Sequence, residues 1–267
     1  VVPMCWSMDT IGPMTRTVED CALMLRAIAG HDPRDSSTSS ESVPDYTATL
    51  GNSIRGIKVG LPDEMFEFSG LDTQVKASAE KAVTLLEELG VEPERNSLPT
   101  SAQSGSVFLA IADVDSAAFH SDWLKTRGDD YDWSTRTRLE SATLTPASAY
   151  LRAQRARELI RQEMLQALDQ FDVIIMPSSP TISPTIESAT GSPGGYYQGR
   201  LDLSRRRYTS PAALAGLPSL SVPCGFSDAG LPMAIQIIGK PFAEETLFQA
   251  GYAYEQATDW HTRKPSI

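Results

Sequence analysis

The sequence predicts an α/β fold in which a mixed β-sheet is flanked by α-helices. A strand, a helix and a second strand follow one another over residues 57–94, and an apolar run occupies residues 172–177. Two further strand-like runs, 218–223 and 231–238, are separated only by a tight turn. The first arrangement is typical of parallel strands joined by a right-handed crossover, whereas a tight turn joins only antiparallel strands. The sheet is therefore expected to be mixed.

The N-terminal part predicts one helix and a long polar loop. Thr17 is a good N-cap, and Asp20 stands near the capping-box position. Apolar residues at helical spacing and Gly30 as a stop signal predict a helix over 18–29. Residues 31–53 are polar and rich in serine, which predicts a surface loop.

The βα units follow in order. We expect a buried strand at 57–62, a helix at 73–89, and a strand at 91–94 that lies at a sheet edge because of Pro93. A helix near 105–126, a charged segment, and a second long helix over about 147–170 come next. The solvent-exposed face of this second helix is expected to carry Arg152, Arg155, Arg161 and Glu163.

The C-terminal half supplies the rest of the sheet. The run at 172–177 predicts a buried strand parallel to the first. Residues 177–200 predict a long functional loop, with a flexible Gly/Ser-rich flap at 190–199. A short helix near 210–216, the antiparallel hairpin and a helix over 243–258 complete the fold.

Composition excludes several classes of protein. The chain has 267 residues and a net charge of −11, so an acidic surface argues against a nucleic-acid partner. Its apolar runs are too short to span a bilayer, and no export signal marks residues 1–12. Three scattered cysteines and three scattered histidines predict neither a disulfide framework nor a metal site. We expect a cytoplasmic protein.

No self-contained catalytic set is present. The segment "GFSDAG" at 225–230 only approaches a nucleophile elbow and suits a hairpin turn better. Cys224 stands beside this turn, and no histidine motif marks a base for it. The alternation of Ser219 and Ser221 with Leu220 and Val222 is typical of a strand. The stretch 216–232 is therefore interpreted as scaffold.

Five blocks in matching order resemble the amidase signature family. They are "WSMDTIGPMTRTVEDCALMLRAIAGHDPRD", "IRGIKVGLP", "TRLESATLTPASAYLRAQRAR", "DVIIMPSSP" and the segment 209–260. The resemblance covers nearly the whole chain, so residues 1–267 are interpreted as one partial domain, the C-terminal portion of that fold. It implies cleavage of amide carbon–nitrogen bonds by a Ser–cis-Ser–Lys triad, with no cofactor and no metal.

The same resemblance places the triad elsewhere. The family's Lys strand, its Gly/Ser-rich loop and its nucleophile segment all precede the block that opens this chain, and none of these strings occurs in residues 1–267. No catalytic residue is therefore assigned. We expect the chain alone to be inactive and the intact parent to be an amidase acting on small-molecule amides.

What the resemblance leaves to this chain is the wall of the substrate pocket. The counterparts of substrate-facing residues are Ser178, Ser179, Thr181, Thr209 and Pro211. Ala213 stands where family members commonly have Asn, which implies either a lost polar contact or a different substrate preference.

Two alternatives to a stand-alone amidase are retained. One is the glutaminase subunit of a tRNA-dependent amidotransferase, placed second because the block at 137–157 is closer to stand-alone amidases and the chain is acidic. The other is a non-catalytic remnant with a binding role. A homodimer is also left open. Without upstream strands, we expect the strands at 57–61, 172–176 and 218–238 to expose edges and apolar faces.

Overall fold

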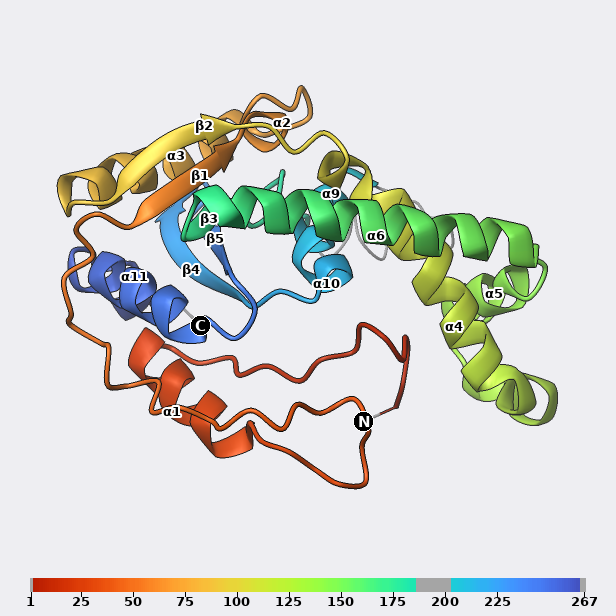
Figure 1. The fold of residues 1–267 in the computed structure, drawn as a ribbon. Coiled ribbons are helices and arrows are strands. Elements are labelled where there is room, and N and C mark those ends of the chain that lie inside the picture. The colour runs from red at the N-terminus through yellow and green to blue at the C-terminus, as the bar shows by residue number, and fades with distance from the viewer. Residues whose placement is uncertain (1, 186–202, 265–267) are drawn as a thin grey trace.

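The computed structural model describes residues 2–185 and 203–264, which contain a five-stranded mixed sheet. The strand order is β2-β1-β3-β5-β4 (Figure 1). The strands are β1 Lys58–Pro62, β2 Glu92–Asn96, β3 Val173–Pro177, β4 Ser219–Phe226 and β5 Pro232–Gly239. β1 pairs in parallel with β2 and β3, while β5 pairs antiparallel with β3 and β4. The predicted fold class and the predicted antiparallel hairpin are confirmed.

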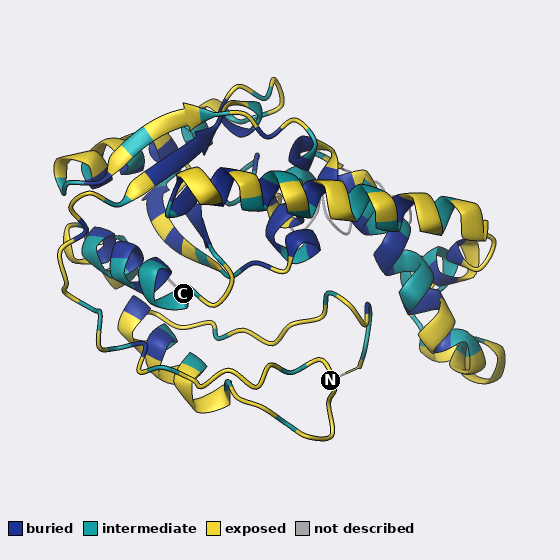
Figure 2. Ribbon diagram, in the orientation of Figure 1, coloured by how far each residue is buried: buried dark blue, intermediate teal, exposed yellow. Residues whose placement is uncertain are grey.

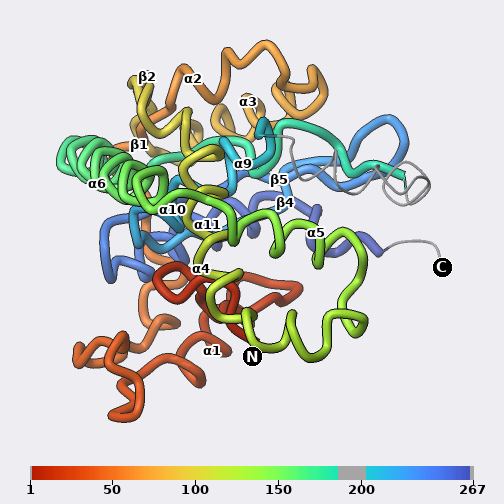
Figure 3. The backbone as a smooth tube through the Cα atoms, turned by 90° about the vertical axis from the view of Figure 1, so that its right-hand side faces the viewer, coloured from red at the N-terminus to blue at the C-terminus, as the bar shows by residue number. Residues whose placement is uncertain are grey.

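Helices cover both faces of the sheet. The α-helices are α1 Val18–Ile28, α2 Asp63–Phe66, α3 Thr73–Glu88, α4 Ser104–Arg127, α5 Trp133–Ala142, α6 Ala147–Gln170, α9 Leu203–Thr209, α10 Pro211–Ala215 and α11 Glu244–Gln256. Short 3₁₀ turns lie at Ser101–Gln103, Gly128–Asp130 and Trp260–Thr262. α3 and α11 pack on one face, and α6, α9 and α10 lie on the other (Figure 1). α4 and α5 extend away from the sheet, and α1 lies on the side opposite α2 and α3 (Figure 3).

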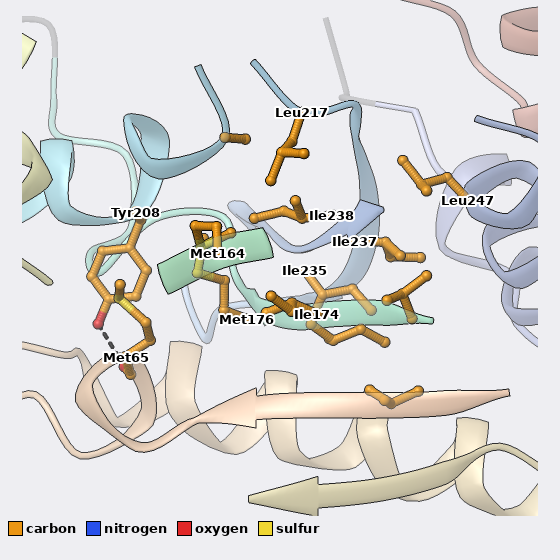
Figure 4. Close-up of a cluster of buried hydrophobic side chains, with 14 of the residues drawn as sticks. Met65, Met164, Ile174, Met176, Tyr208, Leu217, Ile235, Ile237, Ile238 and Leu247 are labelled. Carbon is orange, nitrogen blue, oxygen red and sulfur yellow. Dashed lines mark hydrogen bonds between the residues drawn. The ribbon is translucent and has the colours of Figure 1, made fainter. Parts of the chain in front are cut away.

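The core is centred on β3 and β5. All five residues of β3 are buried, and Ile235, Ile237 and Ile238 of β5 are completely inaccessible to solvent. A strand with helices on both faces buries both of its sides, which explains why "VIIM" is a continuous apolar run rather than an alternating one. Met164 of α6 and Leu247 of α11 belong to the same hydrophobic cluster (Figure 4).

Three α-helices, α2, α5 and α9, were not anticipated from the sequence, and α5 is the longest of them. α5 begins after Asp132, whose carboxylate accepts hydrogen bonds from the backbone N–H groups of Ser134 and Thr135. Its sequence "WSTRTRLESA" has almost no apolar stripe, so periodicity gives no signal there. Capping and ion pairs, such as Arg136 with Glu140, stabilise it instead.

The expectation that the strands at 57–61, 172–176 and 218–238 expose their edges was wrong for all of them except β4. β1 lies between β2 and β3, β3 between β1 and β5, and β5 between β3 and β4, so none of these three has a free edge. The exposed edges of the described sheet belong to β2, as Pro93 predicted, and to β4 (Figure 2).

The prediction of which residues form the solvent-exposed face of α6 also needs a correction. Arg152 and Arg155 are exposed, whereas Arg161 and Glu163 are partly buried. The carboxylate of Glu163 accepts hydrogen bonds from the N–H groups of Thr100 and Ser101, at 2.9 and 2.6 Å. Since helix N-termini leave unpaired N–H groups, this carboxylate satisfies donors at the entry to α4.

Residues 178–185 contain no regular structure, in keeping with the predicted loop. The predicted flap at 190–199 lies outside the described residues.

Candidate functional site

A cavity of about 650 Å³ separates the N-terminal segment from the exposed side of β4. One wall is the coil that leads into α1 (residues 8–18), and the other is formed by α10, the turn after it and β4. The lining groups with hydroxyls include Thr10, Thr15, Thr17, Thr209, Ser219 and Ser221. An apolar cavity with a few convergent polar groups is the usual form of a small-molecule site.

Ser178 lies beside this cavity, where its hydroxyl contacts that of Ser221, a residue of the cavity lining. Its Oγ is 2.8 Å from the Oγ of Ser221, and its N–H donates to the carbonyl of Ala234 at 2.9 Å. Ser221 lies opposite Gln236 of β5, and Ser178 directly follows β3. The strand register therefore brings two hydroxyls that are 43 residues apart onto one face of the sheet.

Thr209 lines the cavity, and its position depends on two buried side chains. Gln236, only 9% exposed, donates from Nε2 to the carbonyl of Tyr208 at 3.0 Å. Tyr208 is fully buried and donates from its hydroxyl to the carbonyl of Met65 at 2.7 Å (Figure 4). Tyr208 is thus held at its backbone carbonyl and at its hydroxyl, which fixes the last turn of α9, including Thr209.

Sequence reasoning missed both Tyr208 and Gln236. The available signal was a lone glutamine in the apolar run of β5, because a buried polar side chain requires a partner. The identity of that partner could not be read from the chain.

Pro211 is buried at the first position of α10 and does not line the cavity. The fixed φ of proline suits that position, and Gly216 ends the helix with φ of 68°. Ala213, by contrast, lines the cavity, so the position where Asn was expected faces the site with a methyl group.

Ser179 and Thr181 are placed with each other rather than in the cavity. The hydroxyl of Ser179 donates to the carbonyl of Thr181 at 2.9 Å and accepts from its N–H at 3.3 Å. These contacts are those of a local turn. Of the five predicted residues, the structure brings Thr209 into the cavity and Ser178 to its margin.

Two carboxylates give the cavity an acidic side. Glu244 and Glu255 of α11 both line it. Glu255 accepts a hydrogen bond from the N–H of Val18 at 2.9 Å, where α1 begins. Burial raises the pKa of Glu255 above its ordinary value, and burial also raises that of Glu244.

Cys224 is not a nucleophile in this arrangement. Its thiol is 5% exposed, and its Sγ lies 3.4 Å from the hydroxyl of Ser78. Burial raises its pKa to about 11, so almost no thiolate exists near neutral pH. The interpretation of this stretch as scaffold agrees with the geometry.

Within the described ranges, no cluster of three or more His, Cys, Asp or Glu side chains could hold a metal ion. No helix in that part of the chain is both long enough and apolar enough to cross a bilayer.

Curated relatives cover the whole chain. In Moorella thermoacetica, the glutamyl-tRNA(Gln) amidotransferase subunit designated A is 36% identical over 290 residues, spanning 100% of this chain and 58% of the relative. The protein of the same name from a Roseiflexus species is 37% identical with the same coverage. The chain therefore spans less than two thirds of the length of these relatives.

Solved structures share the fold. The corresponding glutamyl-tRNA(Gln) amidotransferase subunit from Thermotoga maritima superposes with a TM-score of 0.78 at 31% identity, over 96% of this chain and 54% of that one. A peptide amidase from Stenotrophomonas maltophilia gives 0.74 at 28% identity, over 100% and 56%. The Amidase family model matches residues 1–248. The chain belongs to the amidase family, known by the amidase signature.

Proposed function

We propose that this chain is the C-terminal part of an enzyme that hydrolyses amide carbon–nitrogen bonds through a Ser–cis-Ser–Lys triad supplied by a preceding segment. The match of the family model to residues 1–248 is the observation that carries the proposal. The cavity fits this role as one wall of a substrate cleft, since its described lining offers hydroxyls but no lysine to act as base.

Between the two kinds of amidase, we place the glutaminase subunit of a tRNA-dependent amidotransferase first. From the sequence alone this candidate ranks second. The curated relatives that align with the entire chain at 36 and 37% identity carry the name of such an amidotransferase subunit, and this reverses the order. The reaction proposed for the parent is hydrolysis of the side-chain amide of glutamine, which releases ammonia.

A stand-alone amidase is the second candidate. The peptide amidase neighbour covers the entire chain, and the block at 137–157 resembles such enzymes. Ala213, a methyl group in the cavity wall, is consistent with a substrate other than the one that an Asn would bind there.

The test begins with the coding sequence upstream of Val1, which is expected to contain a Lys-bearing strand and a Gly/Ser-rich loop. Ammonia release by the complete polypeptide is then measured with glutamine and with a panel of aliphatic and peptide amides. Preference for glutamine supports the glutaminase, and preference for the panel supports the stand-alone amidase. Absence of both upstream elements would identify a non-catalytic remnant.

Residues 1–267 alone serve as the negative control, with no turnover expected. Serine-dependent turnover by this chain alone would overturn the placement of the triad.

Thr209 provides a residue-level test of the cavity. The substitution Thr209→Val removes a hydroxyl that lines it while keeping the shape of the side chain. We expect KM to rise by roughly tenfold, the order of one lost hydrogen bond. Thr84→Val is the matched control, because Thr84 is also an exposed helical threonine bonded to the carbonyl four residues earlier, and it does not line the cavity. Equal effects of the two variants would remove Thr209 from the site.

A further inference from the structure

Arg157 of α6 joins three separate parts of the chain. Its Nε donates to the carbonyl of Leu214 at 2.9 Å. Its two terminal nitrogens donate to Ser7, to Oγ at 2.6 Å and to the backbone carbonyl at 3.0 Å. One guanidinium therefore holds α10 and the N-terminal coil at the same time.

These two partners adjoin residues of opposite walls of the cavity. Ser7 immediately precedes Met8, the first lining residue of the N-terminal wall. Leu214 lies in α10, whose residues Ala212 and Ala213 line the other wall. Arg157 itself is absent from the cavity lining, so any influence on the cavity passes through its neighbours.

The chemistry of arginine suits this position. The last carbonyls of a helix lack partners and carry partial negative charge, so a cation placed there is stabilising. The fork of N–H donors allows one side chain to reach Leu214 and both oxygens of Ser7, which a lysine ammonium on a flexible stem cannot do together.

The next arginine on the same helix face makes only half of this connection. Arg161 donates to the carbonyl of Ala215 and has no hydrogen bond to the N-terminal coil among the described residues. It therefore isolates the contribution of the helix-end contact from that of the bridge.

We propose that Arg157 is a positioning residue that fixes the spacing between the two walls of the cavity. The inference rests on the proposed function only in taking the cavity as the substrate cleft. The bridge itself is a geometric property that can be measured without a substrate.

Other contacts hold the N-terminal coil in place when the bridge is removed. The carboxylate of Asp9 accepts from the N–H groups of Met4 and Cys5, at 2.7 and 3.0 Å. The thiol of Cys5 donates to Asp115 of α4 at 3.1 Å. These contacts do not involve Arg157, so an Arg157→Ala variant should fold with a loosened bridge.

Hydrogen exchange and kinetics on the complete polypeptide test the proposal with four variants. Arg157→Ala should accelerate exchange about threefold to tenfold both at residues 4–9 and at 212–217, since one hydrogen-bonding partner is lost at each. Arg161→Ala should accelerate exchange only at 212–217. Arg155→Ala, at an exposed position on α6, should change neither. Arg157→Lys should protect one of the two segments, not both.

The kinetic arm separates positioning from general loss of structure. Arg157→Ala should raise KM about threefold to tenfold with kcat within about twofold of the parent, because the cleft is mis-spaced while the triad is untouched. Arg157→Lys should recover only part of this increase.

The bridge would be overturned if Arg157→Ala accelerated exchange in only one of the two segments. It would also be overturned if Arg161→Ala accelerated exchange in both segments as much as Arg157→Ala does. A fall in kcat with KM unchanged would overturn the positioning role. If the complete polypeptide hydrolyses no amide, the proposed function fails, and the exchange pattern alone then decides for or against the bridge.

Discussion

The two edges of the sheet differ in kind. β2 carries Glu92, Glu94 and Arg95 around Pro93 and is largely exposed (Figure 2). β4 has no charged residue in its eight positions, and its exposed side chains are small, namely Ser219, Ser221 and Pro223. Charges and proline on an edge strand prevent pairing with other strands, so β2 is built to face water.

The contrast indicates how the edge of β4 is used. β4 lacks protective charges, with Pro223 as its single such device, and it borders the cavity. Beside it, α1 and the N-terminal coil expose large apolar side chains: Ile11, Met14, Leu23, Met24 and Ile28. These features support the proposal that a further segment of the parent enzyme packs on this side.

The largest expected effect concerns association. Residues 1–267 alone are expected to self-associate through β4, and Ser221→Lys should reduce this by placing a charge on the unprotected edge. Ser141→Lys, on exposed α5, adds the same charge away from any edge. Sedimentation velocity measures both variants. A monomeric, cooperatively melting wild-type chain would contradict the contrast between the edges and favour an independent module.

The centre of the sheet should be the most sensitive to truncation. Ile237→Ala removes a completely buried side chain of β5 and should lower the free energy of unfolding by about 2–5 kcal/mol. Glu94→Ala on exposed β2 should change it by less than about 0.5 kcal/mol. Urea unfolding measures both variants. Comparable losses of unfolding free energy in the two would mean that β2 is packed rather than solvated.

Loss of the buried hydrogen bond between Gln236 and Tyr208, on the β4 side of the sheet, should have an intermediate effect on the free energy of unfolding. Gln236→Leu leaves the buried carbonyl of Tyr208 without its donor, and we expect a loss of about 1–3 kcal/mol. Gln166→Leu, at an exposed position of α6, is the control. An unchanged midpoint for Gln236→Leu in thermal unfolding would show that another group satisfies this carbonyl.

The smallest effect should depend on pH. Because burial raises the folded-state pKa of Glu255, its contribution is most favourable below the unfolded pKa of about 4.3 and declines as the pH rises through the folded value. Glu255→Gln keeps an acceptor for the N–H of Val18 and should stabilise the protein at pH 7 by about 1 kcal/mol or less. The gain should vanish near pH 4, and Glu87→Gln, at an exposed position of α3, is the control. A destabilised Glu255→Gln at pH 7 would indicate that the charge itself holds α1.

Local sequence determined most of the elements. The helix over 147–170 has the predicted bounds, and the tight turn at 225–230 required an antiparallel hairpin, which β4 and β5 form. Pro93 correctly placed β2 at an edge. These features depend on periodicity, caps and turn residues, which act over a few positions. The family could also be identified from the sequence alone, because its characteristic blocks occur in this chain in the family's order.

Only the tertiary structure decided which distant residues meet. The insertion of β5 between β3 and β4 brings Ser178 to Ser221 and leaves β3 without a free edge. The register of β5 also places Gln236 beside the carbonyl of Tyr208. The packing of α6 directs Glu163 to the start of α4 and lets Arg157 join Ser7 to Leu214. Each of these contacts links segments tens of residues apart. Their pairing is set by strand order and helix packing, and the local pattern of a sequence specifies neither.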